Sequence, residues 1–308
     1  MKRITIIIST IFILASNAFA NSPTNVAGNL ITYQHVMTIG EEGSGPGQFR
    51  YVEDFAISAS GHLLVTDALN ANVQIFNRKT GEFIHSFVAD KDKFEKPEGI
   101  AVDDLGNIYV ADYSSGYIQK FDKNYHHLQT FSDFGVDPGE NMESEFMTIY
   151  NNQLYMADAG NNRVDVFGLD GTFKFIIGED LGLDSPQAAK SSSTGDIYVV
   201  DLGNDRIMVF SSDGKLVKEF GVKGKQPGEF DKPVGLAIDG KDNIYISEDH
   251  NNRIQVFDKD MNLLAYWGNY GKGKGEFNNL HGLLVDERGY VFAADTGNNR
   301  IQVFAPVH

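Results

Sequence analysis

The sequence predicts an all-β protein, specifically a six-bladed β-propeller whose blades are four-stranded antiparallel sheets. The first observation is a ten-residue segment, residues 295–304, that recurs in six copies along the chain. The copies begin 43 to 47 residues apart, at Asp67, Asp112, Asp158, Asp201, Glu248 and Asp295. The second observation is a phenylalanine nine positions after each of these acids. A repeat of this length indicates stacked copies of one supersecondary unit, and four strands per unit are typical of a propeller blade.

Each unit contains four segments with the character of β-strands. Residues 108–111 form a short β-rich run before the acid, and residues 254–257 alternate apolar and polar side chains after it. The Gly-Asn-Asn sequence between such runs tolerates positive φ, as a tight hairpin requires. Apolar runs such as residues 99–102 upstream and 215–220 downstream complete the four strands.

The repeated residues have predicted roles in this unit. We expect the phenylalanine to lie in the core and the acid to cap backbone N–H groups of its own turn. An arginine follows the acid by five positions in four copies and admits two interpretations, an arc that contacts a ligand or a brace for the adjacent turn. These arginines are Arg163, Arg206, Arg253 and Arg300.

The beginning of the chain predicts export. A charged start is followed by the apolar run 4–14 and by Ala18-Phe19-Ala20, a pattern typical of a secretory signal peptide. We therefore expect residues 1–20 to be removed after Ala20 and residues 21–308 to form one propeller domain, periplasmic or extracellular. No later apolar segment is long enough to span a bilayer.

The two ends of the chain predict how the ring closes. The last unit stops at Phe304 with four residues left, so it lacks a fourth strand. Residues 30–39 resemble the fourth strands of other units, yet no unit precedes them. We expect them to complete the sixth blade, because closure removes the exposed sheet edges that promote aggregation.

The repeated motif D-x-G-N-N-R-I-x-V-F, with G-x-x-G-x-x-x-G-x-F between units, resembles the NHL-repeat family over about residues 30–308. This resemblance implies the six-bladed propeller but specifies function only weakly, since one fold supports many activities. The family includes peptidyl-hydroxyglycine lyases, which bind a metal through histidines from several blades. Only His281 falls at a matching position in this chain.

The predicted topology places the first residues of each first strand around one mouth of the central channel. Aligning the units gives Glu53, Glu98, Ser144 or Glu145, Gln187, Val234 and His281 at this level. Three interpretations remain open for this ring: a metal site, a recognition surface for a polar ligand, and a solvated channel without a ligand. No motif specifies a nucleophile, a general base or a cofactor site.

Charge narrows the classes of partner. The chain has a net charge of −16, and loss of Lys2 and Arg3 with the signal peptide lowers it by two, to −18. Such a surface argues against nucleic acid as a partner. The face of the predicted linkers is uneven, because Lys272 and Lys274 lie on one side and the acidic stretch 133–145 on the other. The chain has no cysteine, so disulfides and thiolate metal sites are excluded.

These observations predict an exported, non-catalytic binding or scaffold module, most simply a monomer, without a cofactor. We expect its partner to be a protein, peptide or polysaccharide, held by Glu53, Glu98, Gln187, His281, the four repeated arginines, Lys272 and Lys274. The alternative is a metal-dependent lyase or hydrolase that uses the channel mouth.

Overall fold

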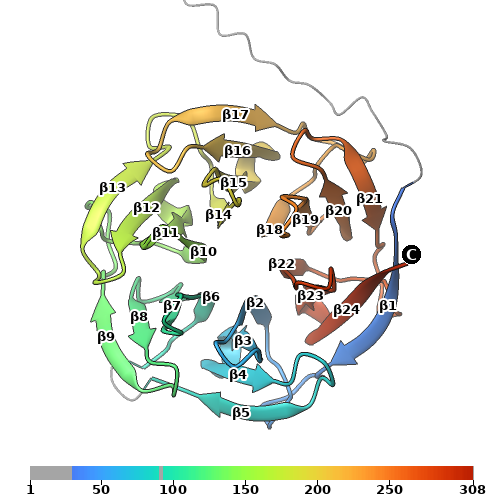
Figure 1. Ribbon diagram of the computed structural model, residues 1–308, viewed down its shortest axis with the longest axis horizontal. Coiled ribbons are helices and arrows are strands. Elements are labelled where there is room, and N and C mark those ends of the chain that lie inside the picture. Colours follow the sequence, from blue (N-terminus) through green and yellow to red (C-terminus); the bar gives the residue numbers. More distant parts are fainter. Residues whose placement is uncertain (1–29, 90–92, 308) are drawn as a thin grey trace, which may run out of the picture.

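The computed structural model describes residues 30–89 and 93–307, which contain β-strands and short 3-10 helices. These strands form four four-stranded sheets and one eight-stranded sheet, arranged as a ring (Figure 1). The eight-stranded sheet consists of two four-stranded units whose innermost strands share one parallel pair, Phe146 with Ala188. The ring therefore contains six four-stranded units, and the predicted all-β propeller is confirmed.

The strands of the first three blades are β2 (Val52–Ile57), β3 (Leu63–Asp67), β4 (Asn72–Phe76) and β5 (Phe83–Phe87); β6 (Pro97–Val102), β7 (Ile108–Asp112), β8 (Ile118–Phe121) and β9 (His127–Phe131); and β10 (Ser144–Tyr150), β11 (Gln153–Asp158), β12 (Arg163–Gly168) and β13 (Phe173–Ile177). Those of the last three are β14 (Pro186–Ser191), β15 (Ile197–Asp201), β16 (Arg206–Phe210) and β17 (Leu216–Phe220); β18 (Pro233–Ile238), β19 (Ile244–Glu248), β20 (Arg253–Phe257) and β21 (Leu263–Trp267); and β22 (Leu280–Val285), β23 (Val291–Asp295), β24 (Arg300–Val307) and β1 (Thr32–Ile39). The 3-10 helices are η1 (Ala68–Asn70), η2 (Ala159–Asn161), η3 (Leu202–Asn204) and η4 (Thr296–Asn298).

The hydrophobic core lies between neighbouring blades. The first strand of each blade borders the central opening and the fourth lies at the rim (Figure 1). One core cluster, for example, joins Val164 and Val166 of the third blade to Val199 and Phe210 of the fourth. The six repeated phenylalanines are at most 1 % exposed, which confirms their predicted place in the core: Phe76, Phe121, Phe167, Phe210, Phe257 and Phe304.

The ring is closed by the N-terminal strand, as predicted. Strand β1 pairs antiparallel with β24, from Thr32 opposite Val307 to Ile39 opposite Ile301. Tyr33 also stacks on Trp267 of the fifth blade, with ring centroids 4.5 Å apart. Closure therefore pairs the edge of the sixth blade and joins it to its neighbour.

The hairpin turn differs from the prediction in how it uses the repeated acid. In five blades the backbone N–H group that this acid accepts belongs to the linker that precedes the first strand, and not to the acid's own turn. Asp158, for example, accepts a hydrogen bond from the Met142 N–H at 2.7 Å. Only Asp112 also accepts turn N–H groups, those of Ser114 and Ser115. The left-handed residue of the turn is the second asparagine, as at Asn162 with φ 57°. The acid thus fastens each hairpin to its linker.

The predicted signal peptide, residues 1–20, lies outside the described residues. Within the described ranges, no helix has the length and apolarity needed to cross a bilayer.

Candidate functional site at the channel mouth

Each innermost strand begins beside the repeated acid, and this register defines the mouth of the channel. Val52 pairs with Asp67, Ser144 with Asp158 and Leu280 with Asp295. The next residue of each innermost strand then occupies the equivalent mouth position. These residues are Glu53, Glu98, Glu145, Gln187, Val234 and His281. Glu145, and not Ser144, is therefore the residue of the third blade at the mouth.

Glycines bring the charged mouth residues close together. A Cβ atom on Gly99 would lie 2.3 Å from the carbonyl oxygen of Glu145. A Cβ atom on Gly282 would lie 2.1 Å from the carbonyl oxygen of Glu53. Side chains at these positions would force the innermost strands apart. The sixth, first, second and third blades therefore present His281, Glu53, Glu98 and Glu145 side by side.

Glu53 and His281 form a buried ion pair. His281 Nδ1 lies 2.7 Å from Glu53 Oε2, and His281 Nε2 lies 3.2 Å from Asn279 Oδ1. Both ring nitrogens face acceptors, so the doubly protonated imidazolium fits best. Burial opposes the charge, but the carboxylates of Glu53, Glu98 and Asp249 together raise the pKa of His281. Asn279 is itself oriented by the hydrogen bond that its amide donates to the Tyr51 hydroxyl, at 3.2 Å.

Glu98 and Glu145 form a pair of carboxyl groups whose pKa values are both raised. Burial and then the neighbouring Glu53 carboxylate raise the pKa of Glu98 to about 7. Burial and then the charge of Glu98 raise the pKa of Glu145 well above its usual value. The two carboxyl groups are hydrogen-bonded to each other, and the bond favours protonated Glu145 as the donor. Such a pair changes charge near neutral pH.

Lys96 completes this cluster and was not predicted. Its ammonium lies 2.5 Å from Glu98 Oε1 and 3.7 Å from the centroid of the Tyr113 ring. Burial opposes its charge, yet Glu98 holds the pKa of Lys96 above its usual value. The equivalent residues of the other blades adopt left-handed backbone conformations, with φ from 51° to 75°: Tyr51, Glu143, Ser185, Lys232 and Asn279. The backbone of Lys96 does not adopt the left-handed conformation. The sequence alone gives no sign of this difference from the other blades.

An ion pair bridges the channel below the mouth. Lys190 Nζ lies 3.3 Å from Asp54 Oδ2. The two residues belong to β14 and β2, which face each other across the central opening (Figure 1). Asp54 is fully buried, and burial raises the pKa of its carboxyl group even beside the Lys190 ammonium. Lys190 lies in a first strand, residues 186–191, that places a lysine and a serine where β18 has only apolar residues, and Lys190 uses its charge in this contact.

The other two mouth positions lack charge. Gln187 is half-buried and donates a hydrogen bond to Ser185 Oγ at 3.3 Å. Val234 is 3 % exposed and packs in a core cluster between blades. The structure therefore brings together Glu53, Glu98 and His281, while Gln187 stays on the neutral side of the mouth.

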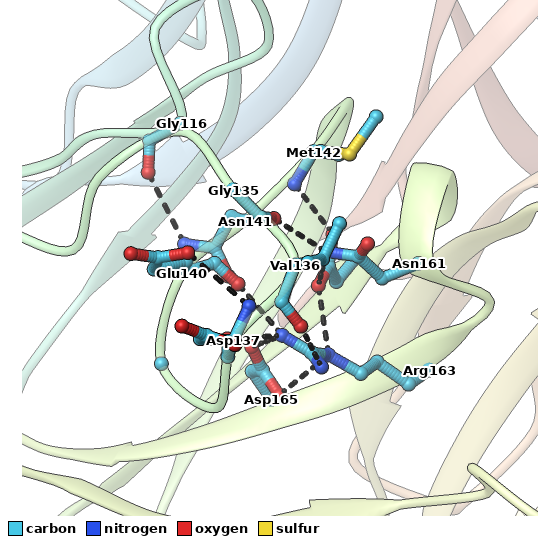
Figure 2. A network of polar contacts seen from close by, with 12 residues as sticks. Gly116, Gly135, Val136, Asp137, Glu140, Asn141, Met142, Asn161, Arg163 and Asp165 are labelled. Carbon is cyan, nitrogen blue, oxygen red and sulfur yellow. Dashed lines mark hydrogen bonds and ion pairs between the residues drawn. The ribbon is translucent and has the colours of Figure 1, made fainter.

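The repeated arginines brace their turns, which is one of the two interpretations left open above. Arg163 Nε lies 2.9 Å from Asp158 Oδ2, and Figure 2 shows its guanidinium pointing at the linker carbonyl oxygens of Val136, Asp137 and Glu140. Arg206, Arg253 and Arg300 likewise contact their own repeat acids through Nε. Arg163 is 3 % exposed and Arg253 is 7 % exposed, so little of either guanidinium remains for a ligand.

The exposed lysines lie on the same face as the mouth but away from the cluster. Lys272 and Lys274 are exposed in the linker before β22. Between the fifth and sixth blades this face has an open cleft of about 380 Å³. The cleft is lined by Lys225, Asp231, Asp249, His250, Asn252, Tyr270, Asn278 and Asn279. Asn279, which lines the cleft, also contacts His281 at the mouth.

The described side chains at this site are not arranged as a set of metal ligands. Across residues 30–89 and 93–307, no group of three or more histidine, aspartate or glutamate side chains is placed to hold a metal ion. At the mouth, Lys96 and His281 already neutralise Glu98 and Glu53.

Comparisons with known proteins agree with the fold. Residues 94–121 match the model of the NHL repeat, and residues 183–258 match a family described as a 6-bladed beta-propeller. No curated protein matches the sequence.

Solved structures share the architecture at low sequence identity. Virginiamycin B lyase from Staphylococcus aureus is 14% identical with a TM-score of 0.66, over 90% of this chain and 100% of that one. A structural genomics protein of unknown function from Bacteroides thetaiotaomicron is 14% identical with a TM-score of 0.69, over 90% and 76% of the two chains. Kuenenia stuttgartiensis hydrazine synthase is 15% identical with a TM-score of 0.58, over 84% and 96%. Identities this low support the fold alone. The repeats, the ring of blades and the two partial family matches together show a β-propeller in which residues 94–121 match the NHL repeat.

Proposed function

We propose that the protein is an exported binding module that holds a protein, peptide or polysaccharide on the face that carries the channel mouth. The observation that supports this best is the contrast between scaffold and mouth. The repeated acids and phenylalanines have the same role in each blade, whereas equivalent mouth positions carry Glu53, Glu98, Gln187, Val234 and His281. A scaffold gains nothing from buried charges that differ from blade to blade, since such charges are costly.

The same face is suited to capture a charged partner. Lys272 and Lys274 are exposed on one side, and the linker 133–145 adds acidic residues on another. This asymmetry orients a polar partner during its approach, an effect that salt weakens. The bridge between Asp54 and Lys190 obstructs the channel below the mouth, so a ligand would enter and leave by this face.

Binding is tested with residues 21–308 on peptide and glycan arrays, followed by two variants. Lys272→Glu with Lys274→Glu should slow association in a salt-dependent manner. Glu98→Ala with His281→Ala should weaken binding independently of salt. A partner whose affinity survives both variants but is lost on substitution near Asp170 or Asp213, on the opposite face, would contradict the proposal. Export is checked separately by mass spectrometry. The mass of the exported protein should equal that of residues 21–308, which begin at Asn21.

A lyase or hydrolase at the same mouth is the second candidate, favoured by the raised pKa values of the adjacent Glu98 and Glu145 carboxyl groups. Buried carboxyl groups with a raised pKa can act as general acids, and virginiamycin B lyase has the same overall fold. Metal analysis of the purified protein and product analysis of bound ligands discriminate the two. A ligand recovered chemically unchanged supports binding, and turnover lost in Glu145→Gln supports catalysis.

A further inference from the structure

One buried oxygen at the mouth lacks a partner. Glu53 is 1 % exposed, and its Oε2 accepts the hydrogen bond of His281. Its Oε1 is buried and has no hydrogen-bond partner among residues 30–89 and 93–307. A buried carboxylate oxygen without a donor costs free energy that a suitable donor would recover. The charge of Glu53 acts on both Lys96 and Glu98, so this oxygen belongs to the mouth cluster.

The surroundings of this oxygen favour a cationic donor. The mouth holds the carboxyl groups of Glu53, Glu98 and Glu145, and the nearby Asp249 carboxylate also acts on His281. The cations of the cluster are Lys96 and His281. His281 contacts Glu53 through Oε2, so a cationic donor at Oε1 would add a charge-assisted hydrogen bond to the same carboxylate.

Lys96 shows how an ammonium group fits here. Its Nζ contacts the Glu98 carboxylate and lies over the faces of Tyr113, at 3.7 Å, and Tyr51, at 5.8 Å. Carboxylates combined with aromatic faces form a favourable environment for a desolvated ammonium group. Lys96 uses Glu98, and Glu53 Oε1 remains without a donor.

The cleft between the fifth and sixth blades provides room for the rest of such a ligand. Asn279 lines the cleft and contacts His281 of the mouth. The cleft offers amide, carboxylate and imidazole groups and the ammonium group of Lys225, with Tyr270 at 71 % exposed as its aromatic residue. Amide and carboxylate side chains match the donors and acceptors of a peptide backbone. A single aromatic ring provides little stacking surface for successive sugar rings.

We infer that the mouth binds a primary ammonium group of a peptide on Glu53, with the peptide chain lying in the cleft beside Tyr270 and Asn279. This inference rests on the proposed binding function and names the chemistry of its ligand. Lys96 then competes with the ligand, because its ammonium group lies beside the same carboxylates and aromatic rings that the incoming ammonium group would contact.

Calorimetric titration of residues 21–308 tests this with two peptides, acetyl-Ala-Lys-Ala-amide and its norleucine analogue, which lacks the ammonium group. The lysine peptide should bind about tenfold more tightly or better, as expected for a charge-assisted hydrogen bond. Glu53→Gln, which preserves the shape of the side chain, should abolish this preference. Glu41→Gln, a change at an exposed acid on the same face, should leave affinity within about twofold.

Lys96→Met provides a second variant, and it should tighten binding of the lysine peptide at pH 8 because it removes the competing ammonium group. Equal affinity for the two peptides, or a preference that survives Glu53→Gln with an unchanged melting temperature, would overturn the inference. If Glu53→Gln fails to fold, the inference is tested by the affinities of the wild-type protein for the two peptides and by the affinity of Lys96→Met for the lysine peptide. Glucosamine oligomers that bind while both peptides fail would overturn the peptide assignment. A neutral or anionic partner that still depends on Lys272 and Lys274 would leave the proposed function intact while this inference fails.

Discussion

The free energy of unfolding should fall as pH rises from about 4.5 to about 8, because several buried acids bind protons more tightly in the folded state. Burial raises the pKa of Asp165 from 3.8 to about 7, and burial with Glu53 raises that of Glu98 from 4.5 to about 7. A group whose folded pKa exceeds its unfolded value contributes stability below the unfolded pKa and loses it as pH rises through the folded pKa. The raised pKa of His281 acts in the same direction.

Asp165 isolates one part of this effect. It lies beside Arg163, with Arg163 Nη2 3.1 Å from Asp165 Oδ2. The equivalent residue is glutamine in four other blades, so this position tolerates an amide: Gln74, Gln119, Gln255 and Gln302. The shift from 3.8 to about 7 corresponds to roughly three pKa units at 1.36 kcal/mol each, an upper limit of about 4 kcal/mol. Asp165→Asn should therefore gain about 2–4 kcal/mol over wild type on going from pH 4.5 to pH 8.

Urea unfolding at each pH measures this, with fluorescence of the single tryptophan, Trp267, as the signal. Trp267 stacks on Tyr33 of β1, so its emission reports ring closure as well as global unfolding. The exposed Asp170, whose pKa is lowered by a hydrogen bond from the Thr172 N–H, provides the control Asp170→Asn, which should leave the slope above pH 4.5 unchanged. Wild-type stability that stays flat or rises across this range would refute the reasoning. An Asp165→Asn slope equal to that of wild type would refute the assignment to Asp165.

Three further predictions concern the scaffold. Phe257→Ala should cost roughly 3–5 kcal/mol in urea unfolding, since this side chain is fully buried; a loss below about 1 kcal/mol would contradict its place in the core. Deleting residues 30–39 should leave the outer edge of β24 unpaired and cause aggregation, seen by light scattering; a monomer with an unchanged melting temperature would argue against closure by β1. Lys190→Met should cost roughly 3–5 kcal/mol by leaving Asp54 buried without its cation, and the double variant with Asp54→Gly should recover most of the loss. A double variant no more stable than Lys190→Met would show that the unpaired Asp54 carboxylate does not cause the loss.

Much of this fold could be predicted because its determinants repeat. The spacing of the acids and phenylalanines specified the units, and the missing fourth strand after Phe304 indicated closure by residues 30–39. The mouth positions followed from the same alignment, which placed Glu53, Glu98 and His281 together. The role of the acid was predicted less well, because its partner is an N–H group some 17 residues upstream, as for Asp295 and Asn278, and only the packing of the linker shows this.

The contacts at the mouth could not be predicted, because they join blades that are distant in sequence. Lys96 looks like an ordinary linker residue, and its place beside Glu98 and Tyr113 depends on a backbone conformation that the equivalent residues do not share. The ion pair of Asp54 and Lys190 joins residues 136 positions apart. Neither contact has a counterpart in the repeat, so periodicity gives no information about them.

Asp54 and Lys190 both replace residues typical of the repeat, and the two replacements depend on each other physically. Asp54 occupies the position that is glycine at Gly99, Gly235 and Gly282, where a side chain would strike the next innermost strand. Its carboxylate instead contacts Lys190, on an innermost strand whose sequence departs from the repeat. Either residue alone would bury a charge without a partner, whereas together they form a bridge across the ring. Because the bridge lies below the mouth and the phenylalanine core lies between blades, residues such as Glu53 and His281 can differ between blades without disturbing the packing that holds the ring together.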